Sequence, residues 1–169
     1  MGDYTLRLTD YTNQVTYVFG ESSAFRYAVA GLMIEYPHRV LWAEVPEGPT
    51  RVWASDGREH PMTGMTIGCD RRSHIAAVRY YEPEGIAFSH NEHPLRPDVC
   101  LPLGCDSLFP SSSHLGFWPI PGLLEEFRAT GGDRPRSISW WPASNGRQKE
   151  RHGELSSAVG ITFPGGAYS

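Results

Sequence analysis

The chain has few cysteines, no long hydrophobic run and no recognisable export signal. Only three of its 169 residues are cysteine, and this odd number favours reduced thiols over a disulfide framework. No apolar run approaches the roughly 18 residues of a membrane span, and residues 1–7 lack the apolar core of a secretory signal. These absences predict a cytoplasmic protein that does not enter a membrane.

An excess of basic residues is also missing. The 15 Lys and Arg side chains are outnumbered by 19 Asp and Glu side chains, which gives a formal net charge of −4. A nucleic-acid-binding protein normally carries a basic stripe, and none dominates this sequence. We therefore expect protein or neutral small-molecule partners, and no nucleic acid.

Common catalytic and cofactor-binding motifs are absent as well. The sequence contains no G-x-S-x-G elbow, no glycine-rich phosphate loop, no H-E-x-x-H and no C-x-x-C. We expect neither an enzyme nor a bound cofactor.

Glycine and proline, in contrast, are plentiful. The 18 glycines and 14 prolines predict short elements joined by many turns. Hydrophobic residues make up 40% of the chain, and a chain of this length can bury about 70% of its surface on folding. A sizeable core is therefore expected without the help of a disulfide or a metal.

Hydrophobic periodicity predicts two helices among a larger number of strands. Apolar side chains recur every three or four positions over residues 22–36 and again from Pro119, with Pro37 and the Gly131-Gly132 pair as stop signals. Residues 90–116 hold too many prolines for a regular element. Strands are predicted at residues 4–9, 14–19, 39–45, 50–54, 65–69, 74–81, 85–89 and 136–141.

Runs of strands between only two helices predict an α+β fold, mainly an antiparallel sheet with both helices packed on one face. The other face must then meet solvent or a partner. Trp140 and Trp141, as neighbours on one strand, are expected to point to opposite faces. We expect one domain over residues 1–141 and a flexible tail over 142–169, where the composition shifts to Ser, Gly, Arg and Lys.

One group of residues has metal-ligand character. His90 and His93 precede Cys100 and Cys105, and zinc accepts two histidines with two cysteines. The six residues between the two pairs are a short spacing that prolines stiffen further. Ordinary loop residues are therefore the preferred interpretation, and a small zinc-binding protein is the alternative function.

Cys69, Asp70 and His74 allow another hypothesis, a cysteine- or histidine-dependent hydrolase. A cysteine nucleophile needs a histidine base and an orienting acid close to it in space. The same residues fit a hairpin turn next to a buried strand cysteine, and we prefer this simpler interpretation.

Negative charge is concentrated in residues 81–110. Five carboxylates stand against a single basic residue, Arg96, and aromatic side chains are interleaved with them. Such a segment is either simply solvated or docks into a basic cleft of a partner. On the second interpretation, the partner-binding residues are Tyr81, Glu82, Glu84, Phe88, Glu92, Asp98, Asp106 and Phe109.

Short motifs in the second half of the chain follow one another in a characteristic order. They are Gly68-Cys69-Asp70, HIAAVRY at residues 74–80, FPSSS at residues 109–113 and LEEFRATGGDRPRSISW at residues 124–140. In this order, over about residues 64–141, the chain resembles the Imm one family, the first numbered class of immunity proteins of bacterial polymorphic toxin systems.

The resemblance implies a cytosolic, non-enzymatic protein. Such a protein binds the C-terminal domain of a cognate toxin, often a nucleic-acid deaminase or a nuclease, and occludes its active site. The insert at residues 90–108 and the residues after Trp141 fall outside the family pattern. Carboxylates placed in a phosphate-binding cleft would compete with nucleic acid for the same electrostatic field.

Overall fold

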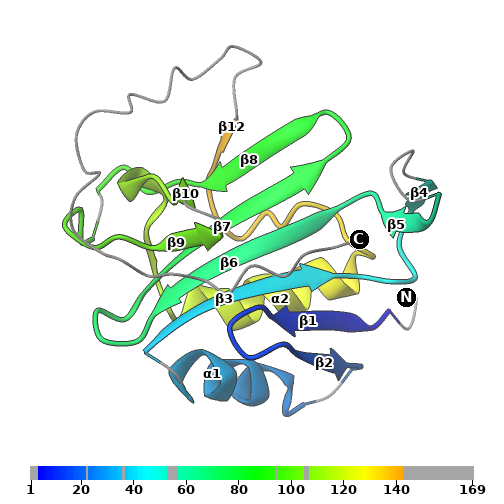
Figure 1. Ribbon diagram of the computed structural model, residues 1–169, viewed down its shortest axis with the longest axis horizontal. Coiled ribbons are helices and arrows are strands. Elements are labelled where there is room, and N and C mark those ends of the chain that lie inside the picture. Colours follow the sequence, from blue (N-terminus) through cyan, green and yellow to red (C-terminus); the bar gives the residue numbers. More distant parts are fainter. Residues whose placement is uncertain are drawn as a thin grey trace, which may run out of the picture.

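An eight-stranded antiparallel sheet forms the centre of the molecule, as the computed structural model shows (Figure 1). The structure describes residues 4–21, 23–35, 37–52, 57–93, 95–104 and 107–142. The main path of the sheet follows the order β12-β8-β7-β6-β3-β1-β2, and β11 pairs with β7 off this path. Its strands are β1 (Leu6–Asp10), β2 (Val15–Phe19), β3 (His38–Glu44), β6 (Gly64–Asp70), β7 (Ile75–Glu82), β8 (Gly85–Ser89), β11 (Leu115–Gly116) and β12 (Trp140–Pro142).

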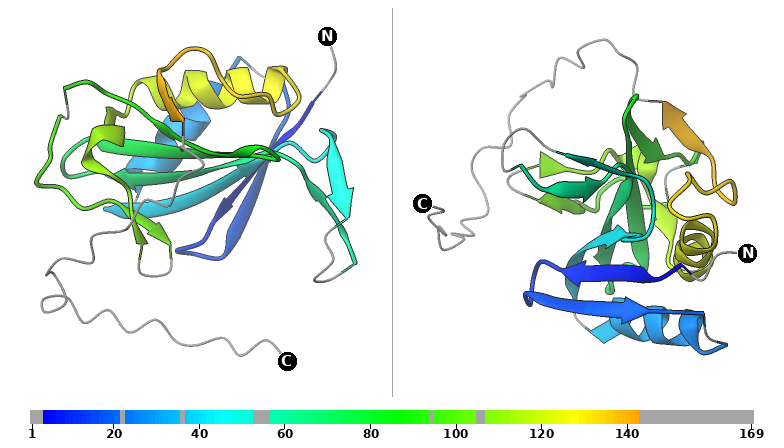
Figure 2. Two further views of the ribbon diagram at one scale, coloured as in Figure 1. Left: turned by 90° about the horizontal axis from the view of Figure 1, so that it is seen from above. Right: turned by 90° about the vertical axis from the view of Figure 1, so that its right-hand side faces the viewer.

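Two helices cover one face of this sheet. Helix α1 (Phe25–Glu35) follows β2, and helix α2 (Pro119–Ala129) follows β11. Both lie behind the sheet in Figure 1 and on a single side of it in Figure 2. The predicted α+β fold with two helices on one face of an antiparallel sheet is confirmed.

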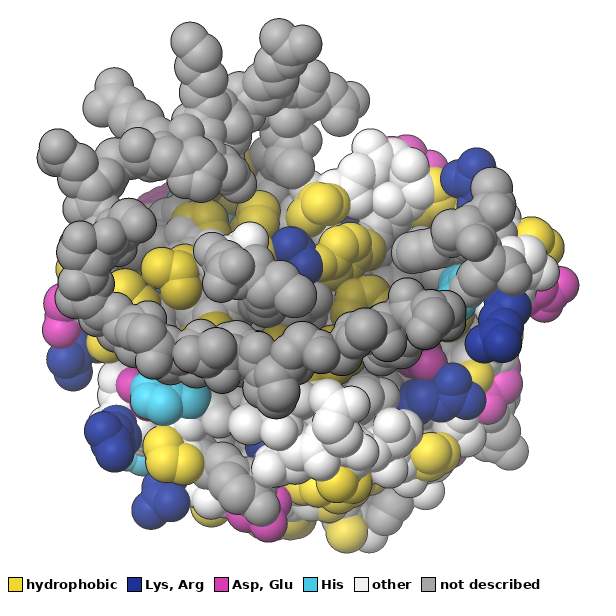
Figure 3. Space-filling view, in the orientation of Figure 1, with side chains coloured by type: hydrophobic (Ala, Val, Ile, Leu, Met, Phe, Trp, Pro, Cys, Tyr) yellow, Lys and Arg dark blue, Asp and Glu magenta, His cyan; other side chains and the backbone are white. Residues whose placement is uncertain are grey.

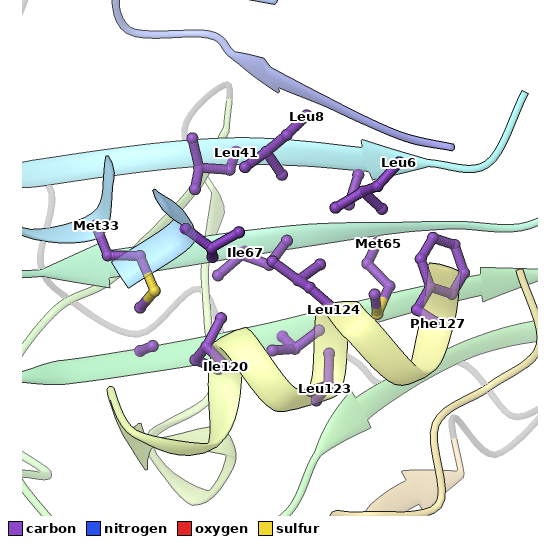
Figure 4. Close-up of a cluster of buried hydrophobic side chains, with 14 of the residues drawn as sticks. Leu6, Leu8, Met33, Leu41, Met65, Ile67, Ile120, Leu123, Leu124 and Phe127 are labelled. Carbon is purple, nitrogen blue, oxygen red and sulfur yellow. The ribbon is translucent and has the colours of Figure 1, made fainter. Parts of the chain in front are cut away.

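The main core lies between the helices and the sheet. Side chains spaced at three and four residues along α2 point toward Met65 and Ile67 of β6 (Figure 4). The helix begins with Pro119, whose missing N–H would be unpaired there in any case. It ends where Gly131 and Gly132 adopt positive φ and donate their N–H groups to the carbonyls of Arg128 and Phe127. These start and stop signals are those expected from the sequence.

A buried arginine fastens α1 to the sheet. Arg39 of β3 forms an ion pair with Asp10 of β1 at 3.1 Å, and neither side chain has exposed surface. Its Nη1 also donates to the carbonyl of Leu32, which lies in α1, at 2.6 Å. Removing one partner of such a pair leaves a buried charge uncompensated, at a cost of about 3–5 kcal/mol.

The second face of the sheet is partly covered by the proline-rich segment. Residues 90–116 contain short strands β9 (Pro102–Gly104) and β10 (Ser107–Leu108), the 3-10 helix η1 (Ser111–Ser113) and β11. Leu101, Leu103 and Phe109 pack on Ile75 and Ala77 of β7 as a second, smaller cluster. The prediction that this segment holds no regular element is therefore wrong in part. Figure 2 shows β9 and β10 on the side of the sheet opposite the helices.

The end of the domain differs from the prediction. The strand expected at residues 136–141 begins only at Trp140, because the Glu126 carboxylate accepts the backbone N–H groups of Arg136 and Ser137 at 2.7 and 3.2 Å and holds the preceding residues in bends. The expected split of the tryptophans is confirmed: Trp140 packs against the main core, and Trp141 is 48% exposed.

Two further predictions fall partly outside the described residues. The strand expected at 50–54 is observed as β4 (Thr50–Val52), paired with β5 (Glu59–Pro61), and residues 53 and 54 lie outside the described part. The expected flexible tail also lies outside the description from residue 143 onward. Neither helix in the described residues has the length and apolar character needed to span a membrane.

Candidate protein-interaction site

A row of five side chains crosses the sheet on the face opposite the helices. The strand registers place Trp42 of β3 beside Thr66 of β6, and Thr66 beside Arg79 of β7. Arg79 in turn lies beside Phe88 of β8, and Phe88 lies beside Trp141 of β12. Directly opposed residues share a face with their β-carbons about 5 Å apart, so the five form a continuous strip, which we call the aromatic row.

Trp42 takes its place in the row because its neighbour has no side chain. A β-carbon on Gly64 would stand 2.5 Å from Cζ2 of the indole, so only glycine leaves room for the ring. The Trp42 ring packs on Tyr81, with 5.3 Å between the ring centroids. Its Nε1 donates to Glu44 at 3.0 Å, and Glu44 also pairs with Arg7 at 2.8 Å. The Glu44 carboxylate is therefore already engaged.

Arg79 is the charged member of the aromatic row. Its guanidinium carbon lies 4.5 Å from the centroid of the Tyr81 ring, within the range of a cation–π contact. Its Nε is buried without a hydrogen-bond partner, and partial burial lowers the pKa of the guanidinium. No carboxylate pairs with Arg79 among the described residues.

Two large hydrophobic side chains on the same face are exposed, one beside the row and one at the far edge of the sheet. Ile86 on β8 is 38% exposed and Val18 on β2 is 65% exposed. Figure 3 views this face and shows hydrophobic side chains gathered around a basic side chain near its centre. Exposed aromatic and aliphatic groups around an arginine are typical of the energetically important centre of a protein interface.

The aromatic residues predicted to bind a partner lie in different environments. Tyr81 and Phe88 are partly buried and belong to the face that carries the aromatic row. Phe109 is only 5% exposed and meets Phe88 edge to face, with 6.2 Å between ring centroids. Phe109 thus holds the proline-rich segment on the sheet.

The structure separates the predicted acidic residues. Glu82 pairs with Arg134 at 3.5 Å, and Asp98 pairs with Arg96 at 3.0 Å. Glu84 and Glu92 are exposed and form no ion pair within the described residues, but the five-residue strand β8 lies between them, a span of about 16 Å. Asp106 lies outside the described residues. The described carboxylates therefore do not form one patch.

The four residues of the zinc hypothesis do not come together where they are described. The His90 ring packs edge to face on Trp141 with 5.2 Å between centroids, while His93 and Cys100 are exposed. Cys105 lies outside the description. Across the described residues, no three His, Cys, Asp or Glu side chains are close enough to hold a metal ion.

The residues of the hydrolase hypothesis also point apart. Cys69 is 1% exposed in the main core, and burial raises the pKa of its thiol to about 12. Although burial opposes it, hydrogen bonds from Ser73 and the Arg72 backbone lower the pKa of Asp70. The His74 ring packs on Phe117 instead of on the thiol. A buried, protonated thiol without a base is no nucleophile at neutral pH.

Sequence reasoning missed a second surface, on the helical side. Tyr27 of α1 is 82% exposed and Trp118, just before α2, is 92% exposed. They border a groove of about 790 Å³ between the helices, which the Arg26–Glu125 ion pair crosses. The buried stripe of α1 is formed by Phe25, Val29 and Met33, and Tyr27 lies outside it. Its position off the apolar stripe is the sequence feature that could have indicated an exposed aromatic side chain.

Comparisons with known proteins assign the chain to no family. No family model matches it, and no curated protein matches it. The motifs behind the resemblance have structural roles here: Gly131 and Gly132 end α2, and the carbonyl of Pro135 accepts the Trp140 Nε1–H at 2.6 Å. These contacts explain how the motif residues shape the fold. They do not indicate a binding partner.

Proposed function

We propose that the chain is an immunity protein of the cytoplasm that binds the C-terminal domain of a cognate bacterial toxin and occludes its active site. The resemblance supplies the class of partner, a nucleic-acid deaminase or a nuclease. The observation that carries a protein-binding role is the aromatic row, in which Arg79 lies on Tyr81 and pairs with no carboxylate of the described residues. Ile86 and Trp141 of the same face are exposed nearby.

Charge at the rim of this face supports the same proposal. Glu84 directly precedes β8, Glu92 follows its last residue by three positions, and both are exposed. A toxin that acts on nucleic acid needs a basic surface to hold phosphates. Rim carboxylates would attract such a surface and raise the association rate.

The proposal is tested by co-expression with the toxin domain encoded beside this chain. We expect restored growth of the host and a complex that survives purification. Absence of both would reject the immunity function.

A pair of variants then locates the docking surface. Ile86→Glu places a charge beside the aromatic row, whereas Ile34→Glu makes the same change at an isoleucine of α1 that is 51% exposed. We expect Ile86→Glu to abolish binding and Ile34→Glu to preserve it. The reverse result would place the docking surface on the helical side of the sheet.

A further inference from the structure

We propose that Arg79 is a receptor for a carboxylate, presented by an acidic polypeptide segment with apolar neighbours that docks on the aromatic row. The source of that segment, the toxin domain, rests on the function proposed above. The chemistry of the site rests only on the surroundings of Arg79.

The first reason is that Arg79 lacks the side-chain partner that the other two non-exposed arginines of the described residues have. Three arginines of the described residues are not exposed: Arg39, Arg79 and Arg128. Arg39 pairs with Asp10, and Arg128 donates to the Tyr4 carbonyl. Arg79 is partly buried too, but its guanidinium lies over the face of Tyr81 and pairs with no carboxylate of the described residues. Partly buried charges without a partner are costly and uncommon.

The second reason is geometric. Tyr81 supports the guanidinium from one side, while Thr66 and Phe88 are its cross-strand neighbours. A guanidinium fixed by stacking offers its planar edge to an incoming group, and this edge matches the two oxygens of a carboxylate. Glu44, an acidic side chain on the same face, is held by Trp42 and Arg7.

The surroundings favour a polypeptide over a small anion. Ile86 and Trp141 extend apolar surface beyond the arginine, to an extent that one small anion would leave uncovered. A docking segment that places an Asp or Glu side chain on Arg79 would cover these groups with its neighbouring residues. Desolvation by those residues would strengthen the charge pair.

The site is tested first without any toxin. The probe is N-acetyl-aspartyl-leucinamide, and the neutral control is N-acetyl-asparaginyl-leucinamide. In the full-length protein, we expect the aspartyl probe to shift the NMR signals of the Arg79 Nε–H and the Trp42 indole N–H saturably at millimolar concentrations. Arg79→Met should abolish the response, and Arg72→Met, at an exposed turn arginine, should preserve it. No response, or an equal response to the neutral probe, would overturn the proposal.

Thermal unfolding gives a second readout. A residue kept for binding is expected to be neutral or unfavourable for stability, so Arg79→Met should leave the melting temperature unchanged or raise it. Arg128→Met should lower it, since that guanidinium donates to the Tyr4 carbonyl at 2.8 Å. A comparable loss in both variants would assign Arg79 a structural role and overturn the proposal.

Binding to the toxin domain separates this inference from the proposed function. We expect Arg79→Met to weaken the complex by more than about tenfold, as for truncation of one member of a buried charge pair. A complex that tolerates Arg79→Met would overturn the role of Arg79 and leave the immunity function standing. If the protein responds to the aspartyl probe but does not bind the toxin domain, the immunity function is rejected and the carboxylate site at Arg79 is supported.

Discussion

The Phe109 ring lies so close to Gly68 that a β-carbon on the glycine would stand 2.7 Å from Cε2 of the ring. The same β-carbon would lie 2.8 Å from the carbonyl oxygen of Pro102. Gly68 belongs to β6, so the proline-rich segment touches the sheet backbone itself. This contact explains why the segment follows the sheet surface.

The contact predicts that Gly68→Ala destabilises the protein. Overpacking of this kind costs about 1–3 kcal/mol, because either the ring or the segment must move. Gly116→Ala is the matched control, since a β-carbon there meets nothing within 4 Å, and we expect a change within about 0.5 kcal/mol. Urea unfolding measures both values. Equal stability of the two variants would contradict the packing of Phe109 on β6.

A second prediction concerns the histidine beneath this segment. His114 has no exposed surface; burial lowers the pKa of its imidazole, although a hydrogen bond with the Arg96 carbonyl at 3.1 Å opposes the shift. The unfolded chain therefore binds a proton more readily than the folded one. The stability contributed by neutral His114 is present above about pH 6.5, the pKa of histidine in the unfolded chain. It is lost as the pH falls through the lowered pKa that His114 has in the folded protein.

The variant His114→Gln removes this titration while keeping a polar side chain. We expect the free energy of unfolding of the native protein to fall more steeply between pH 7.5 and 5.5 than that of the variant. Urea unfolding at several pH values provides the measurement. Parallel pH profiles would assign the acid sensitivity to other groups.

Burial of Cys69 gives a prediction about thiol chemistry. A variant with Cys100→Ser and Cys105→Ser leaves Cys69 as the only thiol. We expect no reaction with Ellman's reagent at neutral pH in the folded state, because burial raises the pKa of this thiol to about 12. One equivalent should react in denaturant. Rapid reaction of the folded protein would reopen the hydrolase hypothesis.

The helices show what the sequence could predict. Pro119 starts α2, apolar residues recur along one face, and Gly131-Gly132 stops it, so each signal is local and each acts within the helix. The eight-strand sheet was predictable only as a set of alternating segments. Alternation tells which residues share a face, but the pairing of distant strands depends on contacts that no local pattern contains.

The candidate site was less predictable for the same reason. Trp42, Arg79 and Trp141 are far apart in the chain, and the registers of four strand pairs bring them into one row. Tyr81 and Phe88 could be named as candidates because they lie near acidic residues in the sequence. The strand predicted at residues 85–89 is observed as β8 and separates Glu84 from Glu92.

The separation of Glu84 and Glu92 leads to a prediction about binding rates. Glu84→Lys and Glu92→Lys each change the net charge by the same amount, as does the control Glu21→Lys before α1. We expect the first two to slow association with the toxin domain and to flatten its dependence on salt, because rim charges act mainly on encounter. Dissociation rates should change little. Stopped-flow association at low and physiological salt measures the effect. If the two variants bind as fast as the control, the toxin approaches from the helical side, where Tyr27 and Trp118 are the exposed aromatic groups.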